Sequence, residues 1–259
     1  MSGTTRPDPS PTGRQDGDDQ LSMMHRLPPA RLVERFAYLT DLVAGHRAVH
    51  VGFVDAGYQS MQTGAGTWLH AHLDSVASSL VGVDVDVDGV ERARADGYEA
   101  YAADACDADA VAALGIEPAE VVLAGEVIEH VDAPGEFLEA MKHLVAPGGR
   151  LVLTTPNASS LGNALLAFGG IEITHPDHLL QFSWLTLDTL LRRHGWEPLS
   201  WATFVPSVKP LQGTGAKARV LEAGARGLIW IERTAGRLGA PFVAESLIVE
   251  ARAVDVPVR

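Results

Sequence analysis

The chain has 259 residues, of which 46% are hydrophobic and 20% are charged, and its formal net charge is −13. This length and apolar content suffice for one hydrophobic core, and the single cysteine, Cys106, excludes a disulfide scaffold and a cysteine-based zinc site. No apolar run is long enough to span a membrane, and the negative charge would repel the phosphates of extended nucleic acid.

The N-terminal region is polar and rich in Pro, Gly, Ser, Thr and Asp, so we expect residues 1–27 to form a disordered tail. It contains no apolar secretory segment, and the cytoplasm is therefore the expected compartment. We expect one domain over residues 28–259. Its first element is an amphipathic helix from Ala30 to Leu42 that ends near Gly45.

Short apolar runs then alternate with helical patterns along the chain. The strands are expected at residues 47–54, 80–84, 98–103, 120–124, 150–155, 196–205 and 245–251. The helices are expected at residues 68–73, 87–96, 108–114, 134–144 and 186–194, with a helical insertion at about 206–244. This order predicts an α/β fold: a Rossmann-like, doubly wound, mostly parallel seven-stranded sheet with helices on both faces.

In such a sheet, ligands bind beyond the carboxyl ends of the strands. Glycines after the first strand would allow close approach of a ligand, Asp84 could accept hydrogen bonds from two ribose hydroxyls, and Asp104 could accept from an adenine amino group. The residues expected to contact this cofactor are Gly52, Asp55, Gly57, Asp84, Val85, Asp104, Ala105 and Gly125. No G-x-G-x-x-G follows the first strand, which disfavours NAD and favours S-adenosylmethionine.

Three motifs carry a family resemblance over about residues 47–205. They are Val81-Gly-Val-Asp84, Gly125-Glu-Val-Ile-Glu-His-Val131 and Leu144-Val-Ala-Pro-Gly-Gly-Arg-Leu-Val-Leu-Thr-Thr-Pro-Asn157. The chain thereby resembles the class I S-adenosylmethionine-dependent methyltransferases. It departs from their first motif, because His50 stands where the family usually has an acidic residue.

The E-x-x-E-H run and the later His178 are similar to those of two groups within this family, the small-RNA 3′-terminal 2′-O-methyltransferases and the ubiquinone-pathway O-methyltransferases. The resemblance implies that Glu126, Glu129, His130 and His178 bind Mg²⁺ or another divalent cation. Such an ion would hold a hydroxylate near the methyl group. Without a metal, His130 or His178 could act as a general base, or both could be structural histidines, with Glu129 accepting backbone N–H groups.

The resemblance implies a methyltransferase that acts on a small-molecule acceptor, most simply on a hydroxyl oxygen. The acceptor pocket is expected at residues 126–131, at residues 157–178 and in the insertion. The alternatives are an RNA 2′-O-methyltransferase, a degenerate binding protein with the same fold and, third, a nicotinamide dehydrogenase. No membrane partner is expected, and the sequence leaves the oligomeric state open.

Two further groups of residues have less specific interpretations. His70 and His72 are expected on the surface of a helix. The basic residues of the insertion are expected on a solvated helix face, with a lid or a docking surface as the alternative; they are Lys209, Lys217, Arg219, Arg226, Arg233 and Arg237.

Overall fold

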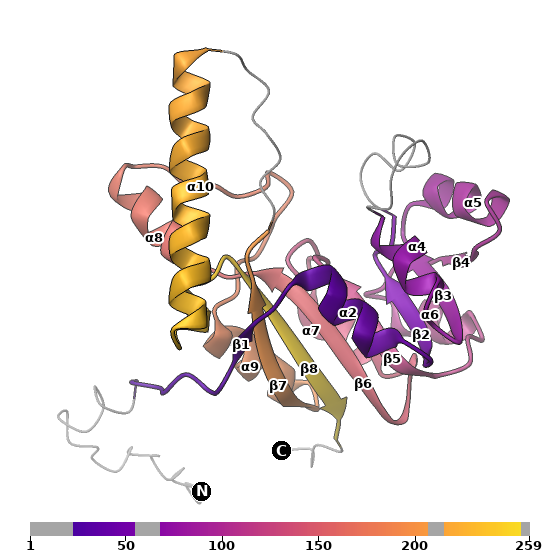
Figure 1. Cartoon of the computed structure of the whole chain (residues 1–259). Helices are drawn as coiled ribbons and strands as arrows, with labels where there is room; N and C mark the ends of the chain where they lie inside the picture. Colours follow the sequence, from indigo (N-terminus) through magenta and orange to yellow (C-terminus); the bar gives the residue numbers. More distant parts are fainter. Residues whose placement is uncertain (1–22, 55–67, 207–214, 255–259) are drawn as a thin grey trace, which may run out of the picture.

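The computed structural model describes residues 23–54, 68–206 and 215–254 (Figure 1). An eight-stranded sheet in the order β1-β7-β8-β6-β5-β2-β3-β4 forms its centre. The strands are β1 (Arg31–Leu32), β2 (Arg47–Val51), β3 (Ser79–Asp84), β4 (Glu99–Ala102), β5 (Ala119–Gly125), β6 (Val145–Pro156), β7 (Trp196–Phe204) and β8 (Ser246–Ala253). Every pairing is parallel except those of β8, which runs antiparallel to both of its neighbours.

Helices cover both faces of this sheet (Figure 1). They are α2 (Arg35–Val43), α4 (Leu69–Asp74), α5 (Val87–Ala95), α6 (Ala108–Ala113), α7 (Pro134–Met141), α8 (Leu161–Phe168), α9 (Trp184–Arg193) and α10 (Ala216–Arg237), with a 3-10 turn, η1, at Pro241–Val243. Buried residues of α6, α7 and α9 pack on one face, whereas those of α2 and α4 pack on the other.

The period-two pattern of the strands explains this double burial. In β5, Val122 and Ala124 belong to the core under α6, α7 and α9, whereas Val121 and Leu123 belong to the core under α2 and α4. A strand buried on both faces is an almost continuous apolar run, which is the pattern that identified these strands in the sequence.

The doubly wound, mostly parallel prediction is confirmed, but the number of strands was wrong by one. Residues 30–33 were expected in the first helix; instead, Arg31 and Leu32 pair with the edge of β7, and α2 begins only at Arg35. The carboxylate of Glu34 accepts hydrogen bonds from the backbone N–H groups of Phe36 and Ala37, which fixes this later start. Apolar spacing alone could not distinguish a short edge strand from a first helical turn.

The insertion before β8 consists largely of α10, a helix of 22 residues that extends away from the sheet beside α8 (Figure 1). Residues 207–214, including Lys209, lie outside the described part of the chain. The sequence analysis did not predict α8, which begins at the N-cap Ser160. Within the described residues, no helix is both long and apolar enough to cross a membrane.

A buried carboxylate joins the antiparallel end of the sheet to α2. Glu250 of β8 accepts hydrogen bonds from the hydroxyls of Tyr38 and Ser200, both at 2.7 Å, and from the Arg150 guanidinium at 2.8 Å. Burial raises the pKa of Glu250, but these three donors outweigh it and leave the pKa below its usual value of 4.5. Ionised Glu250 therefore contributes to the stability of the fold.

We predict that Glu250→Ala lowers the free energy of unfolding by about 2–4 kcal/mol at pH 7, because three donors lose their acceptor. Because folding depresses this pKa, the contribution is present above pH 4.5 and is lost as the pH falls through the folded-state value. Urea unfolding at pH 7 and near pH 3 measures this difference. The control is Glu197→Ala, which removes an exposed ion pair with Arg252 and should cost no more than about 1 kcal/mol. Equal losses for the two variants would contradict the prediction.

Candidate functional site

The sheet reverses its winding between β2 and β5, and this is where a doubly wound fold binds its ligands. From β2 the chain adds β3 and β4 on one side, and then β5 and β6 on the other. The carboxyl ends of β2, β3 and β5 therefore lie side by side. They bring Gly52, Asp84 and Gly125 to one edge of the sheet.

Asp84 ends β3 and is 9% exposed. Its two carboxylate oxygens accept hydrogen bonds from the backbone N–H groups of Val54, at 2.8 Å, and Asp86, at 2.9 Å. Burial raises the pKa of Asp84, while these two N–H groups oppose that shift. A carboxylate has about four acceptor positions, so Asp84 can accept two further hydrogen bonds from a ligand.

Gly52 follows β2 in the left-handed region, with φ of 69°. A Cβ atom there would also collide with the side chain of Val127, in the loop after β5. Backbone conformation and close packing therefore both require glycine at this position. The other two residues expected in this loop, Asp55 and Gly57, lie outside the described part of the chain.

The remaining expected cofactor contacts lie at the carboxyl ends of neighbouring strands. The side chain of Asp104 accepts a hydrogen bond from the backbone N–H of Cys106, which closes a turn after β4 around Ala105. Val85, directly after Asp84, is 71% exposed and available to a ligand. Gly125 lies beside the guanidinium of Arg35, which a Cβ atom would approach within 2.9 Å.

The histidine in the first motif is buried rather than exposed to a ligand. His50 is 4% exposed, and its Nδ1 lies 3.2 Å from Nδ1 of His70 on α4. His70 is fully buried, so the expectation that it lies on the surface was wrong, whereas His72 is exposed. Burial lowers the pKa of His70 to about 3 and holds that of His50 well below 6.5, with smaller effects of His70 and Arg35 on His50. One neutral ring donates to the other.

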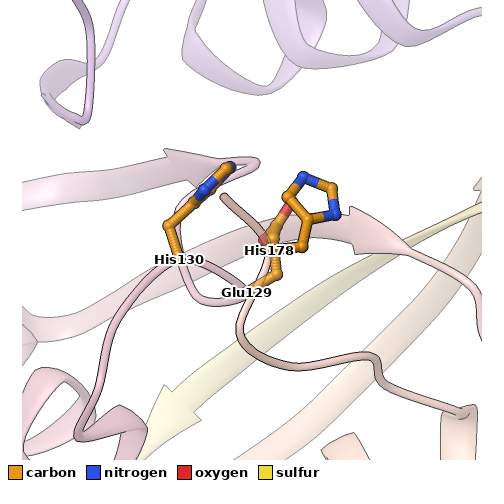
Figure 2. A group of neighbouring side chains, drawn as sticks. All are labelled: Glu129, His130 and His178. Carbon is orange, nitrogen blue, oxygen red and sulfur yellow. The ribbon is translucent and has the colours of Figure 1, made fainter. Parts of the chain in front are cut away.

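Three of the four expected metal ligands converge after β5. Figure 2 shows the side chains of Glu129, His130 and His178 close together. Each offers a ligand atom within 4.8 Å of those of the other two. The two imidazole centroids are 4.5 Å apart, and His178 reaches this position because the N–H groups of Leu179 and Leu180 donate to the carbonyl oxygen of Glu129.

Glu126, the fourth expected ligand, is not part of this group in the structure. It is the one non-glycine residue with positive φ, at 58°, among the described residues. Its carboxylate accepts a 2.7 Å hydrogen bond from the hydroxyl of Thr154, to which Arg35 donates in turn at 3.3 Å. These hydrogen bonds hold the Glu126 side chain on Thr154 and help to offset the cost of its strained backbone conformation.

The carboxylate of Glu129 is fully buried and only half satisfied. One oxygen accepts a hydrogen bond from the hydroxyl of Thr155 at 3.1 Å, whereas Oε1 has no hydrogen-bond partner among the described residues. Burial, and then the negative charge of Glu126, raise the pKa of Glu129 to about 8. A buried carboxylate with one unpaired oxygen and two imidazoles nearby suits a cation or a proton.

The two histidines are oriented as ligands or bases. Nδ1 of His130 lies 3.1 Å from the carbonyl oxygen of Asp177, so an N–H there would leave Nε2 as the basic atom. Burial lowers the pKa of His178, and the nearby rings of His130 and His175 add to this shift. The neutral form, which is the form that binds metals, is therefore favoured.

The side chains that hydrogen-bond to Glu126 and Glu129 were not among the expected site residues. Thr154 and Thr155 lie inside the motif that ends at Asn157, but their contacts with Glu126 and Glu129 require the β5–β6 pairing. Arg35 comes from the start of α2 and carries no local motif. Glu245 is a further carboxyl group near Glu126: burial, and then the negative charge of Glu126, raise its pKa.

A hollow of about 610 Å³ lies between the segment that follows β6 and the segments that precede β1, α9 and β8. It overlaps the expected acceptor pocket at Asn157, Ser159 and the end of the insertion. Its other walls come from α9, η1 and the segment before β1. It shares no lining residue with Glu129, His130 and His178, the carboxylate–histidine group. Most of its lining is apolar, and its size suits a small organic molecule.

Two solved structures illustrate the shared fold. A methyltransferase dependent on S-adenosylmethionine from Archaeoglobus fulgidus aligns with a TM-score of 0.50 at 15% identity, over 83% of this chain and 89% of that one. Magnesium protoporphyrin IX methyltransferase from Synechocystis, solved with S-adenosylhomocysteine, gives a TM-score of 0.50 at 13% identity, over 85% and 80% of the two chains. At these identities the likeness shows the fold.

Similar sequences are named ubiquinone biosynthesis O-methyltransferases. That of Burkholderia orbicola is 31% identical over 61% of this chain and 63% of its own length. That of Caulobacter sp. is 44% identical over 24% of this chain and 25% of its own length, and that of Roseobacter denitrificans is 28% identical over 73% and 79%. The chain thus spans 25% of the length of the Caulobacter sp. relative and 63% of the length of the Burkholderia orbicola relative.

The sequence profile of the methyltransferase domain matches residues 60–200, which is more than half of the chain. This range includes Asp84, the E-x-x-E-H run and His178, and it ends within β7. The chain belongs to the methyltransferase domain family.

Proposed function

We propose that this protein transfers a methyl group from S-adenosylmethionine to a hydroxyl oxygen of a small-molecule acceptor. The observation that carries the proposal is the position of Asp84, whose carboxylate has unused acceptor capacity at the ligand-binding edge of the sheet. Membership of the methyltransferase family supports the reaction class, and the names of the similar sequences support oxygen as the methylated atom.

The described residues fit an adenosyl ligand. Asp84 would accept from the two ribose hydroxyls, and Gly52 would lie at the adjacent end of β2, where its positive φ shapes the backbone beside the ligand. Val85 and Ala105 would contact the adenine ring, with Asp104 accepting from its amino group. Bound S-adenosylmethionine supplies an activated methyl group, so the protein has mainly to align the acceptor and exclude water.

We predict that Asp84→Ala weakens the binding of S-adenosylhomocysteine by about 1–3 kcal/mol, because hydroxyl donors lose their charged acceptor. Isothermal titration calorimetry measures this affinity. Asp88→Ala, an acidic residue in the first turn of α5, is the matched control and should leave the affinity unchanged. Undetectable binding to the wild-type protein at millimolar ligand would instead support the alternative of a degenerate binding protein, which has the same fold but no longer binds the cofactor.

We further propose a divalent cation at the carboxylate–histidine group. Oxygen and nitrogen donors suit Mg²⁺ or Mn²⁺, and the unpaired Oε1 of Glu129 lacks a partner that a cation would supply. Glu129, His130 and His178 would hold the ion, and the nearby negative charge of Glu126, which acts on Glu129, would favour a cation there. The ion would lower the pKa of an acceptor hydroxyl.

As the acceptor oxygen is methylated, its hydroxyl proton must pass to a base. If no cation is bound, Nε2 of His130, oriented by the carbonyl oxygen of Asp177, and the neutral ring of His178 would be the available bases. Either could take the hydroxyl proton as the oxygen attacks. Thr155 would keep the Glu129 carboxylate in place through its hydrogen bond.

We predict that the affinity for Mn²⁺ rises with pH up to about 8, because the ion must displace the proton that burial and Glu126 favour on Glu129. Calorimetric titration at pH 6.5, 7.5 and 8.5 measures this dependence. His178→Ala should lower the affinity at least tenfold. His175→Ala removes a neighbouring imidazole outside the group and should change it less than twofold. Equal affinities for the two variants would remove the metal assignment.

The choice of acceptor is tested by activity. We predict that catechol and related phenols support release of S-adenosylhomocysteine, whereas a short RNA with a free 3′-terminal 2′-hydroxyl does not. The net charge of −13 disfavours the polyanion, and the mostly apolar hollow that overlaps the expected acceptor pocket favours a small organic ring. Methylation of the RNA terminus at a higher kcat/KM than any phenol would favour the RNA 2′-O-methyltransferase alternative.

A further inference from the structure

The outer side of α10 carries a stripe of four exposed arginines. Arg219, Arg226 and Arg233 follow one another at intervals of two helical turns, and Arg237 continues the stripe. The stripe is about 27 Å long, since eighteen residues separate its ends. Among the described residues, Glu222 is the one acidic side chain within ion-pair distance of it, 4.0 Å from Arg226.

An apolar strip runs beside these arginines on the same exposed side. Trp230 is 68% exposed and lies next to the stripe, and Ile231 and Leu238 are 43% and 83% exposed. Among the described residues, a Cβ atom on Gly224 or Gly227 would meet no other group within 4 Å. Within the described part of the chain, the outer side of α10 therefore carries arginines along one edge and exposed apolar side chains along the other, and no described element covers it.

The inner side of α10 is fixed to the rest of the protein. Glu232 is 1% exposed and accepts a hydrogen bond from the backbone N–H of Gly162, at the start of α8. Leu228 packs against the same glycine, and Gly236 lies against Leu32 of β1. Because these contacts hold the inner side, the helix cannot turn its arginines and Trp230 inward without breaking them.

We propose that the outer side of α10 docks on the surface of a bilayer that contains anionic lipids. A bilayer presents phosphates directly above an apolar layer, which matches an arginine edge beside a Trp, Ile and Leu strip. Nucleic acid offers the phosphates without the apolar layer. The net charge of −13 over the whole chain, with four arginines gathered here, would turn this helix toward an anionic surface.

This docking differs from the expectation of no membrane partner, which rested on the lack of a spanning segment. A helix that lies on the bilayer needs no such segment, because only one side of it enters the headgroup region. The docking does not depend on the proposed reaction, and its test uses neither methyl donor nor acceptor.

The test is co-sedimentation of the full-length protein with vesicles of phosphatidylcholine, with and without about 30 mol% phosphatidylglycerol. We expect binding to the anionic vesicles that falls with added salt, and little binding to pure phosphatidylcholine. Arg226→Gln/Arg233→Gln should weaken binding about 30-fold, because each arginine contributes about fivefold near an anionic surface. Trp230→Ser should also weaken it, and the fluorescence of the wild type should shift to the blue on binding.

The matched control is Arg192→Gln/Arg193→Gln, which removes two exposed arginines of α9 and changes the net charge equally. It should change vesicle binding less than twofold. The proposal is overturned if the wild type ignores anionic vesicles or if both double variants lose binding equally. It is also overturned if the protein prefers a short RNA at the same salt, or if the stripe instead mediates a dimer that Arg226→Gln/Arg233→Gln dissociates.

Discussion

The reversal of winding between β2 and β5 is the constraint on which the candidate site depends. Parallel strands bring their carboxyl ends to one edge, and the reversal leaves that edge open between the crossover helices. Asp84 and the group after β5 share this edge although they are separated by two strands and two helices along the chain. The hydrogen bond from Val54 to Asp84 then fixes the end of β2 against the end of β3.

Unfavourable electrostatics accompany the site. Glu126, Glu129 and Glu245 lie near one another, with Arg35 as a nearby cation, and burial raises the pKa of both Glu129 and Glu245. Such an arrangement lowers the stability of the folded protein unless a proton or a metal ion compensates for the charge. Buried carboxylates with shifted pKa values are typical of functional sites, which often lower the stability of the folded protein.

The sheet and the insertion before β8 differ in their proposed roles. The sheet carries the edge at which we propose that the cofactor binds, while α10 extends away from the sheet (Figure 1). The buried Glu232 of α10 accepts a hydrogen bond from the backbone N–H of Gly162 in α8. Burial, together with Glu245, raises the pKa of Glu232 to about 7 although the Gly162 N–H opposes this shift. The insertion is therefore attached through a carboxylate that faces the same acidic surroundings as the site.

The sequence by itself determined the order of the strands and helices from β2 onward, apart from α8, together with the positions of Asp84, Gly52 and the E-x-x-E-H run, and the family. These features are local: apolar runs buried on both faces, glycine where φ is positive, and motifs of a few residues. The tertiary structure decided which of them meet. It placed Glu129, His130 and His178 together, because His178 lies in the loop before α9, which folds back against the end of β5. It placed Glu126 outside this group, because the pairing of β5 with β6 brings its carboxylate to the hydroxyl of Thr154. It also buried His70 against His50 and made Arg31 and Leu32 an edge strand, since burial and edge pairing depend on residues distant in the chain.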